Sequence, residues 1–226
     1  MNDSIDREGG VAPAVMPVDR EAWFDAVNLS MFVNTYYQLR DVRQWAGASK
    51  TILIIGPGQG LDAAVFRWKK YEVTTFDIDS TFNPDVIGSC HEMPMFRDRH
   101  FDVVIVSHVL EHLPIAYLDP ALAEIARVGR FVLAYLPVAG RHPSVTLDMG
   151  FKSIELTAVA DLFNPARKPD PARPKFCSGQ HYWEIGYRGF SKRAVRERLA
   201  RQFEVLAEYR NKDWTPSYNF VLRSQR

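Results

Sequence analysis

The stretch TILIIGPGQGLDAAVFRW, from Thr51 to Trp68, decides the fold of this chain. It opens with an apolar, largely β-branched run, Ile52 to Ile55, which breaks into glycines at positions 56, 58 and 60 before a helical pattern begins. This succession predicts a buried parallel strand, a tight turn and a helix N-terminus. Bare backbone and its N–H groups can then approach a ligand closely. A G-x-G-x-G turn occurs in several kinds of site, so its surroundings must identify the ligand.

Outside this stretch, strand patterns alternate with helical ones. We expect further strands at 71–77, 85–88, 101–107, 130–137, 203–210 and 218–225, and helices at 62–70, 118–128 and 192–201. One or two helices are expected between Glu21 and Trp45, and Ser191 is a suitable N-cap for the last helix. The pattern predicts an α/β fold with a doubly wound, mostly parallel seven-stranded sheet whose last strand is antiparallel.

The predicted domain organisation is simple. Residues 1–18 are rich in glycine, proline and aspartate and are expected to be poorly ordered, whereas 19–226 form a single domain. Residues 141–189 are expected to form an irregular lid inserted after the fifth strand, on the substrate side. Four prolines between Asn164 and Pro174 exclude a regular helix there.

Composition narrows the class of protein. A net charge of +1 over 226 residues gives no sign of a nucleic-acid or membrane binder. Two cysteines, Cys90 and Cys177, make no disulfide framework, and no Cys/His group has zinc spacing, so we expect no metal. The first 20 residues lack the features of a signal peptide, and no apolar run reaches the ~18 residues of a membrane span. We therefore expect a soluble, cytoplasmic protein.

Asp77 stands about 20 residues beyond Gly56, at the end of the second predicted strand. A carboxylate in this place can accept hydrogen bonds from both vicinal hydroxyls of a ribose. The alternative is that Asp77 only caps the next segment. Asp79 is interpreted as a turn residue.

Five segments, in this order and spacing, resemble the class I S-adenosylmethionine-dependent methyltransferases. They are IIGPGQG (54–60), TTFDID (74–79), GSCHEMPM (88–95), FDVVIVSHVLEHLP (101–114) and FVLAYLP (131–137). NAD-binding domains match less well, because their usual G-x-G-x-x-G places the third glycine one position later than Gly60. The resemblance implies a Rossmann-like methyltransferase with S-adenosylmethionine as its cofactor.

The resemblance also implies a set of cofactor-binding residues: Tyr37, Gly56, Pro57, Gly58, Gly60, Asp77, Ile78, Ser89, Cys90, His91, Ser107 and His108. The glycine turn would carry the amino-acid part of the cofactor, and Asp77 the ribose, while Ile78 would pack on the adenine. Ser107 and His108 would lie beside the methionine part, and Tyr37 or Tyr36 would bond to the carboxylate. The family commonly has an Asp where this chain has Ser89, so the bond to the adenine amino group would lack charge assistance.

Methyl transfer requires in-line positioning of the acceptor and, where the acceptor is protonated, a base. His112, just after the fourth strand, is the first candidate and His181 the second. The alternative for His112 is a supporting role in the local helix, because Glu-His-Leu recurs in family members with different substrates. His108 would either touch the methionine end or only line the pocket.

The acceptor is less clearly indicated. The segment from Arg167 to Arg193 contains seven basic and two acidic residues. This excess of positive charge favours an anionic small molecule as the acceptor, unless the segment is only a solvated loop. No Asn-Pro-Pro-Tyr type site follows the fourth strand, which argues against exocyclic amines of nucleic acid and favours O-methylation of a small or glycan-like acceptor. The oligomeric state stays open. Two alternatives remain for the protein as a whole: a non-catalytic S-adenosylmethionine-binding sensor or interaction protein, and an NAD-dependent oxidoreductase.

Overall fold

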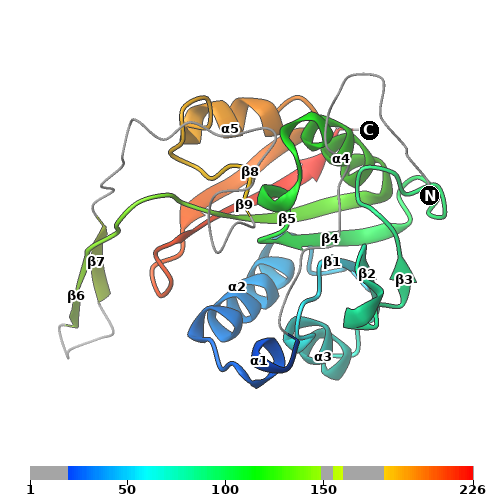
Figure 1. Cartoon of the computed structure of the whole chain (residues 1–226), viewed down its shortest axis with the longest axis horizontal. Coiled ribbons are helices and arrows are strands. Elements are labelled where there is room, and N and C mark those ends of the chain that lie inside the picture. Colours follow the sequence, from blue (N-terminus) through cyan, green and yellow to red (C-terminus); the bar gives the residue numbers. More distant parts are fainter. Residues whose placement is uncertain (1–19, 149–154, 160–180, 226) are drawn as a thin grey trace.

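The computed structural model describes residues 20–148, 155–159 and 181–225. A seven-stranded sheet lies between two layers of helices (Figure 1). Its strands are β1 (Thr51–Ile55), β2 (Glu72–Asp77), β3 (Val86–Ile87), β4 (Phe101–Ser107), β5 (Gly129–Pro137), β8 (Phe203–Arg210) and β9 (Ser217–Ser224). The helices are α1 (Arg20–Asp25), α2 (Leu29–Trp45), α3 (Leu61–Trp68), α4 (Ile115–Val128) and α5 (Lys192–Leu199), with short 3-10 turns η1 (Ser80–Phe82) and η2 (Leu110–His112).

The central strand shows why the sheet is covered on both faces. On β1, Leu53 and Ile55 belong to the core that includes side chains of α4 and α5, whereas Ile52 and Ile54 belong to the core that includes α2 and α3. Each of these four side chains is at most 3% exposed. Burying one such side chain contributes about 1.5–3 kcal/mol. The continuous apolar run in the sequence therefore reflects burial on both sides.

The strand order positions the functional site. It is β3-β2-β1-β4-β5-β9-β8, with parallel pairing from β3 to β5 and antiparallel pairing of β9 with both β5 and β8. The chain moves outward from β1 in one direction, to β2 and β3, and then returns to add β4 on the other side. The carboxyl ends of β1 and β4 thus border a crevice, the usual ligand site of open α/β sheets.

The predicted fold class, a doubly wound seven-stranded sheet, is confirmed. The predicted strands and helices after α3 begin and end within a few residues of their predicted bounds, and the Ser191 hydroxyl accepts a hydrogen bond from the Ala194 N–H as an N-cap (3.1 Å). Within the part of the chain that the structure describes, no helix is both long and apolar enough to cross a membrane.

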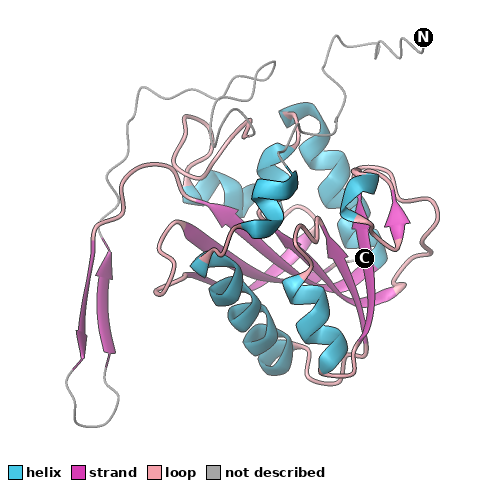
Figure 2. Cartoon of the chain, turned by 60° about the horizontal axis from the view of Figure 1, so that its bottom comes forward, coloured by secondary structure: helices cyan, strands magenta, loops and turns pink. Residues whose placement is uncertain are grey.

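The predicted irregular insertion needs a correction. Two strands, β6 (Ser144–Asp148) and β7 (Glu155–Val159), pair antiparallel inside it. Both contain β-branched residues, which favour extended backbone, and the nearby prolines obscured this signal. The two strands extend away from the main sheet (Figures 1 and 2). The prolines at 165–174 and the N-terminal residues 1–18 lie outside the described residues.

Candidate active site

A pocket opens at the crevice between the carboxyl ends of β1 and β4. The turns after β1, β2, β3 and β4 line it, together with α1 and η1, through Trp23, Ile55, Gly56, Gly58, Phe76, Asp77, Ile78, Asp79, Phe82, Gly88, Ser89, Cys90, His108, Val109, His112 and Leu113. Segments that are separate in sequence meet here because parallel strands end at the same edge of the sheet.

The glycine turn forms one wall. Gly56 has φ +67°, and a Cβ there would lie 2.4 Å from Cγ2 of Val109. The Gly56 N–H donates to the carbonyl of Phe76 (2.9 Å), and the Gly60 N–H closes the turn on the carbonyl of Pro57 (2.8 Å). Only glycine fits at position 56, because any other side chain meets both the strained φ and the valine. The backbone surface that a cofactor would pass is therefore bare.

Asp77 lies at the carboxyl end of β2, on the pocket wall beside Ile78. Its Oδ1 accepts a hydrogen bond from the N–H of Asp79 (2.9 Å), which holds the carboxylate at the turn. Asp79 in turn accepts from the N–H of Thr81 (2.9 Å) and caps η1. Asp79 is the turn residue that the sequence indicates, and it lines the pocket as well.

Ser89 and Cys90, which follow β3, also line the pocket. The Ser89 hydroxyl is 2.7 Å from Nδ1 of His91. If that hydroxyl donates to the imidazole, its oxygen keeps lone pairs for another donor. Burial raises the pKa of the Cys90 thiol to about 12, so this cysteine is not a nucleophile at neutral pH.

Some residues expected at the cofactor do not line the pocket: Tyr37, Pro57, Gly60, His91 and Ser107. Tyr37 is buried, and its hydroxyl donates to Oδ2 of Asp213 (2.6 Å), so it belongs to the core. The ring of His91 packs against Tyr117, with ring centroids 4.7 Å apart. These two side chains therefore have other partners, and the pocket lining does not support them as cofactor contacts.

The structure adds pocket residues that sequence reasoning missed. Trp23 of α1 and Phe82 of η1 line the pocket in edge-to-face contact, with centroids 6.4 Å apart. Gln59 of the glycine turn holds α1 through the carbonyls of Trp23 and Ala26. Trp23 lies in the stretch that predicted the first helices, but helical spacing alone does not distinguish a core aromatic from one that covers a ligand.

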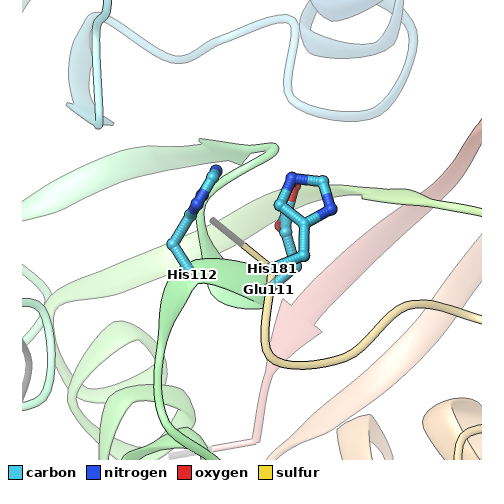
Figure 3. A group of neighbouring side chains, drawn as sticks. All are labelled: Glu111, His112 and His181. Atoms are coloured by element: carbon cyan, nitrogen blue, oxygen red, sulfur yellow. The ribbon is translucent and has the colours of Figure 1, made fainter. Parts of the chain in front are cut away.

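His112 and His181 contact each other, but of the two only His112 lines this pocket. The two rings lie edge to face with centroids 4.8 Å apart. The segment that follows His181 is hydrogen-bonded to η2. The Tyr182 N–H donates to the carbonyl of Glu111 (2.8 Å), and Nε1 of the Trp183 indole donates to the carbonyl of Leu110 (3.1 Å). In Figure 3 the side chains of Glu111, His112 and His181 extend from these two segments toward the same side. The sequence named both histidines but not their contact.

Glu111 is the least expected member of this group. Its side chain is fully buried, with Nδ1 of His108 at 3.5 Å and Nε2 of His181 at 4.0 Å from Oε1. Burial opposes its charge, but the imidazoles of His108, His112 and His181 outweigh this and lower the pKa of Glu111 below its ordinary value. The carboxyl group is therefore ionised at neutral pH.

Comparison with known proteins agrees with this geometry. The family model described as "Methyltransferase domain" matches residues 53–131, which span β1 to the start of β5. Residues 53–131 thus carry a methyltransferase domain. S-adenosylmethionine is the cofactor of such domains, and the bare backbone at Gly56 and the carboxylate of Asp77 fit its amino-acid and ribose parts. The oxidoreductase alternative gains no support.

Solved structures show the same fold at low sequence identity. The PH0226 protein from Pyrococcus horikoshii is 14% identical with a TM-score of 0.57, covering 90% of this chain and 95% of that one. The Burkholderia thailandensis 1,6-didemethyltoxoflavin-N1-methyltransferase, bound to 1,6-didemethyltoxoflavin and S-adenosylhomocysteine, is 18% identical with a TM-score of 0.54, covering 98% of both chains. The N-methyltransferase NodS from Bradyrhizobium japonicum, in complex with S-adenosylhomocysteine, is 10% identical with a TM-score of 0.56, covering 92% of this chain and 97% of that one. No curated protein sequence matches the chain.

Proposed function

We propose that this methyltransferase transfers the methyl group to an oxygen of a small or glycan-like molecule whose hydroxyl lies beside His112 and His181. The observation that carries the proposal is that His112 lines the same pocket as Gly56 and Asp77. The residues suited to the cofactor and the residues suited to proton chemistry therefore share one cavity.

The cofactor end is proposed from the residues that line the pocket. The backbone at Gly56 and Gly58 lies beside the amino-acid part of the cofactor. Asp77 accepts hydrogen bonds from the ribose hydroxyls, and Ile78 packs on the adenine. Ser89 and the backbone of Cys90 meet the adenine edge. The cofactor supplies an activated methyl group, so the remaining task of the chain is to orient the acceptor and handle its proton.

An oxygen acceptor suits the histidine end. A hydroxyl must lose its proton as it is methylated, whereas a neutral amine already carries a free lone pair. An imidazole assists this by accepting the proton or by holding a cation that acidifies the hydroxyl, and both routes require His112 at the pocket. The N-methyltransferase names of the solved structures describe those proteins, and their low identity extends only the fold to this one.

The finer features of the proposal rest on the sequence. The basic excess between Arg167 and Arg193 supports an anionic small molecule rather than a nucleic acid, although residues 167–180 lie outside the described part of the chain. We assign residues 141–189 to covering the acceptor side, which would require β6 and β7 to fold back toward the pocket. The cysteine usage supports a cytoplasmic location.

Calorimetry with S-adenosylhomocysteine tests the cofactor end. Replacing Asp77 with alanine should lower the affinity at least tenfold, because the ribose loses its charged acceptor. Asp98→Asn is the control, since its side chain is 79% exposed and lies outside the pocket. No binding by the parent protein would contradict the proposal.

Transfer from labelled S-adenosylmethionine to small molecules of a cell extract tests the acceptor end and excludes a sensor that only binds the cofactor. The product should disappear in Asp77→Ala. His112→Ala should lower the transfer rate about 10²- to 10⁴-fold while S-adenosylhomocysteine still binds. A product whose new methyl group is on nitrogen or carbon contradicts the oxygen assignment.

A further inference from the structure

We propose that Glu111, His112 and His181 bind one divalent transition-metal cation, of the Zn²⁺ or Mn²⁺ kind, at the acceptor end of the pocket. Each residue offers one potential ligand atom, and these atoms lie within 4.8 Å of one another. Two imidazole nitrogens and a carboxylate oxygen are a common ligand set for such cations. Figure 3 shows the three side chains extending toward the same side from η2 and from the segment at His181.

Glu111 supplies the second, independent observation. Its side chain is 0% exposed, and neither carboxylate oxygen has a hydrogen-bond partner among the described residues. The nearest imidazole nitrogens, at 3.5 Å and 4.0 Å, are beyond ordinary hydrogen-bond length. A buried carboxylate that accepts no hydrogen bond is costly even beside histidines, and a bound cation would satisfy both its charge and its lone pairs.

The orientation of His181 suits a ligand. Its Nδ1 is 2.8 Å from Oε1 of Glu184, which holds the proton on that nitrogen. Its Nε2 therefore turns a lone pair toward Glu111, 4.0 Å away. Two acceptors facing each other need a proton or a cation between them, and this gap is too long for a hydrogen bond. A carboxylate behind the imidazole is the usual arrangement for a metal-binding histidine.

The local charge favours a divalent ion. Glu111 and Glu184 are both ionisable acids, at 0% and 8% exposure. The ion pairs of these carboxylates in the described part of the chain involve histidines only. When the imidazoles bind a metal as neutral ligands, the two carboxylates carry two negative charges, which one divalent cation balances.

The geometry leaves room for an exogenous ligand. Ligand atoms on one zinc ion, at about 2.0–2.1 Å from it, lie roughly 3.3 Å apart in a tetrahedral site. The ligand atoms of the cluster, now within 4.8 Å of one another, would therefore close by up to about 1.5 Å when a cation binds. Three protein ligands leave a fourth position, and it would open toward the pocket because His112 lines the pocket.

This position would serve the proposed function, on which the following step rests. A cation beside the acceptor lowers the pKa of its hydroxyl. The hydroxyl releases its proton to water, its oxygen forms the new bond to the methyl carbon, and the electrons of the broken carbon–sulfur bond remain on sulfur. His112 then acts as a ligand and not as the base.

Metal titration of the full chain tests the site without any acceptor. Protein stripped with a chelator should bind one equivalent of Zn²⁺ by calorimetry, and of Co²⁺ by visible absorption. Glu111→Gln and His181→Ala should each weaken this binding at least tenfold. His100→Ala, which removes an exposed histidine outside the cluster, should retain full affinity. The site is overturned if the parent protein does not bind one equivalent of metal. It is also overturned if both cluster variants bind the metal as tightly as the parent does.

Thermal unfolding provides a second readout. The melting temperature of the parent protein should rise with Zn²⁺, and this rise should be absent in Glu111→Gln. Should that variant fail to fold, His112→Asn decides instead, and unchanged Zn²⁺ affinity in it overturns the site. Calorimetry with S-adenosylhomocysteine separates the two proposals: cofactor binding without metal binding overturns the metal site alone. Metal binding without cofactor binding overturns the proposed function and leaves the metal site standing.

Discussion

Two fully buried carboxylates, Asp41 in α2 and Glu111 in η2, have opposite surroundings. Asp41 Oδ2 accepts hydrogen bonds from the hydroxyls of Tyr135 (2.7 Å) and Tyr209 (2.5 Å), and Arg40 pairs with Oδ1 (2.7 Å). Glu111 accepts no hydrogen bond within the described residues and faces histidines at longer distances.

The hydrogen bonding of the two carboxylates distinguishes a structural role from a ligand-binding role. A buried charge whose hydrogen bonds are all made joins the elements around it, here α2, β5 and β8. A buried charge that accepts no hydrogen bond costs stability, and a fold can retain it where it serves a ligand. The region of Asp41 should therefore determine stability, and the pocket should determine binding.

The largest effect is expected at Asp41. Asp41→Asn removes the charged acceptor of two tyrosine hydroxyls and should lower the free energy of unfolding by about 3 kcal/mol. Chemical denaturation measures this change, and Tyr209→Phe, which removes one donor, should cost about 1 kcal/mol. S-adenosylhomocysteine affinity should stay within twofold in any variant that folds. A cost below about 1 kcal/mol for Asp41→Asn would show that the buried network contributes little.

Gly56 should show the next largest effect, on binding. Gly56→Ala places a Cβ 2.4 Å from Val109 and forces the turn to move, which should weaken S-adenosylhomocysteine at least about 30-fold, or about 2 kcal/mol. The matched variant is Gly60→Ala. That position also has positive φ (+78°), but a Cβ there meets no atom within 4 Å. Calorimetry should therefore show a clearly smaller loss in Gly60→Ala. Equal losses would indicate backbone strain and not the contact with Val109.

The next effect concerns Asp62, a partly buried carboxyl group in the first turn of α3. Burial raises its pKa to about 6, above the value in the unfolded chain. Folding therefore favours the protonated carboxyl group. Its contribution to the free energy of unfolding is complete below about pH 4 and is lost as the pH rises through about 6. Asp62→Asn should remove the loss and stabilise the protein at pH 8 by about 1 kcal/mol, because the residue is only partly buried. Denaturation of both proteins at pH 5 and pH 8 measures it. A difference that does not change with pH would contradict the raised pKa.

The smallest effect on stability is expected at Glu111. In metal-free buffer, Glu111→Gln breaks no hydrogen bond made within the described residues, so its free energy of unfolding should change by less than about 1 kcal/mol. Glu111→Gln and Asp41→Asn each replace a buried carboxyl group with an amide of the same shape. Measuring both in the same denaturation experiment tests whether the two carboxylates differ in their contribution to stability. A loss as large as that at Asp41 would assign Glu111 a structural role.

Much of the site follows from local sequence. The run Thr51–Ile55 and the glycines after it indicated the strand, the turn and the bare backbone, because β-branched periodicity and positive φ are local properties. Asp77 and Ser89 could be placed at the pocket because they directly follow predicted strands. Tyr37 could not, because a helical pattern does not show which of two adjacent tyrosines turns inward.

The sequence by itself determined the doubly wound sheet and the pocket wall formed by the glycine turn and Asp77, since both depend on segments whose pattern is complete within a few residues. Only the tertiary structure decided which residues meet at His112. Glu111 and His112 meet His181 because the segment at 181–185 pairs with the end of β5 and with η2. Such contacts between distant segments depend on packing, and no local periodicity encodes them. The burial of Glu111 among histidines, on which the proposed metal site rests, is a property of the folded chain.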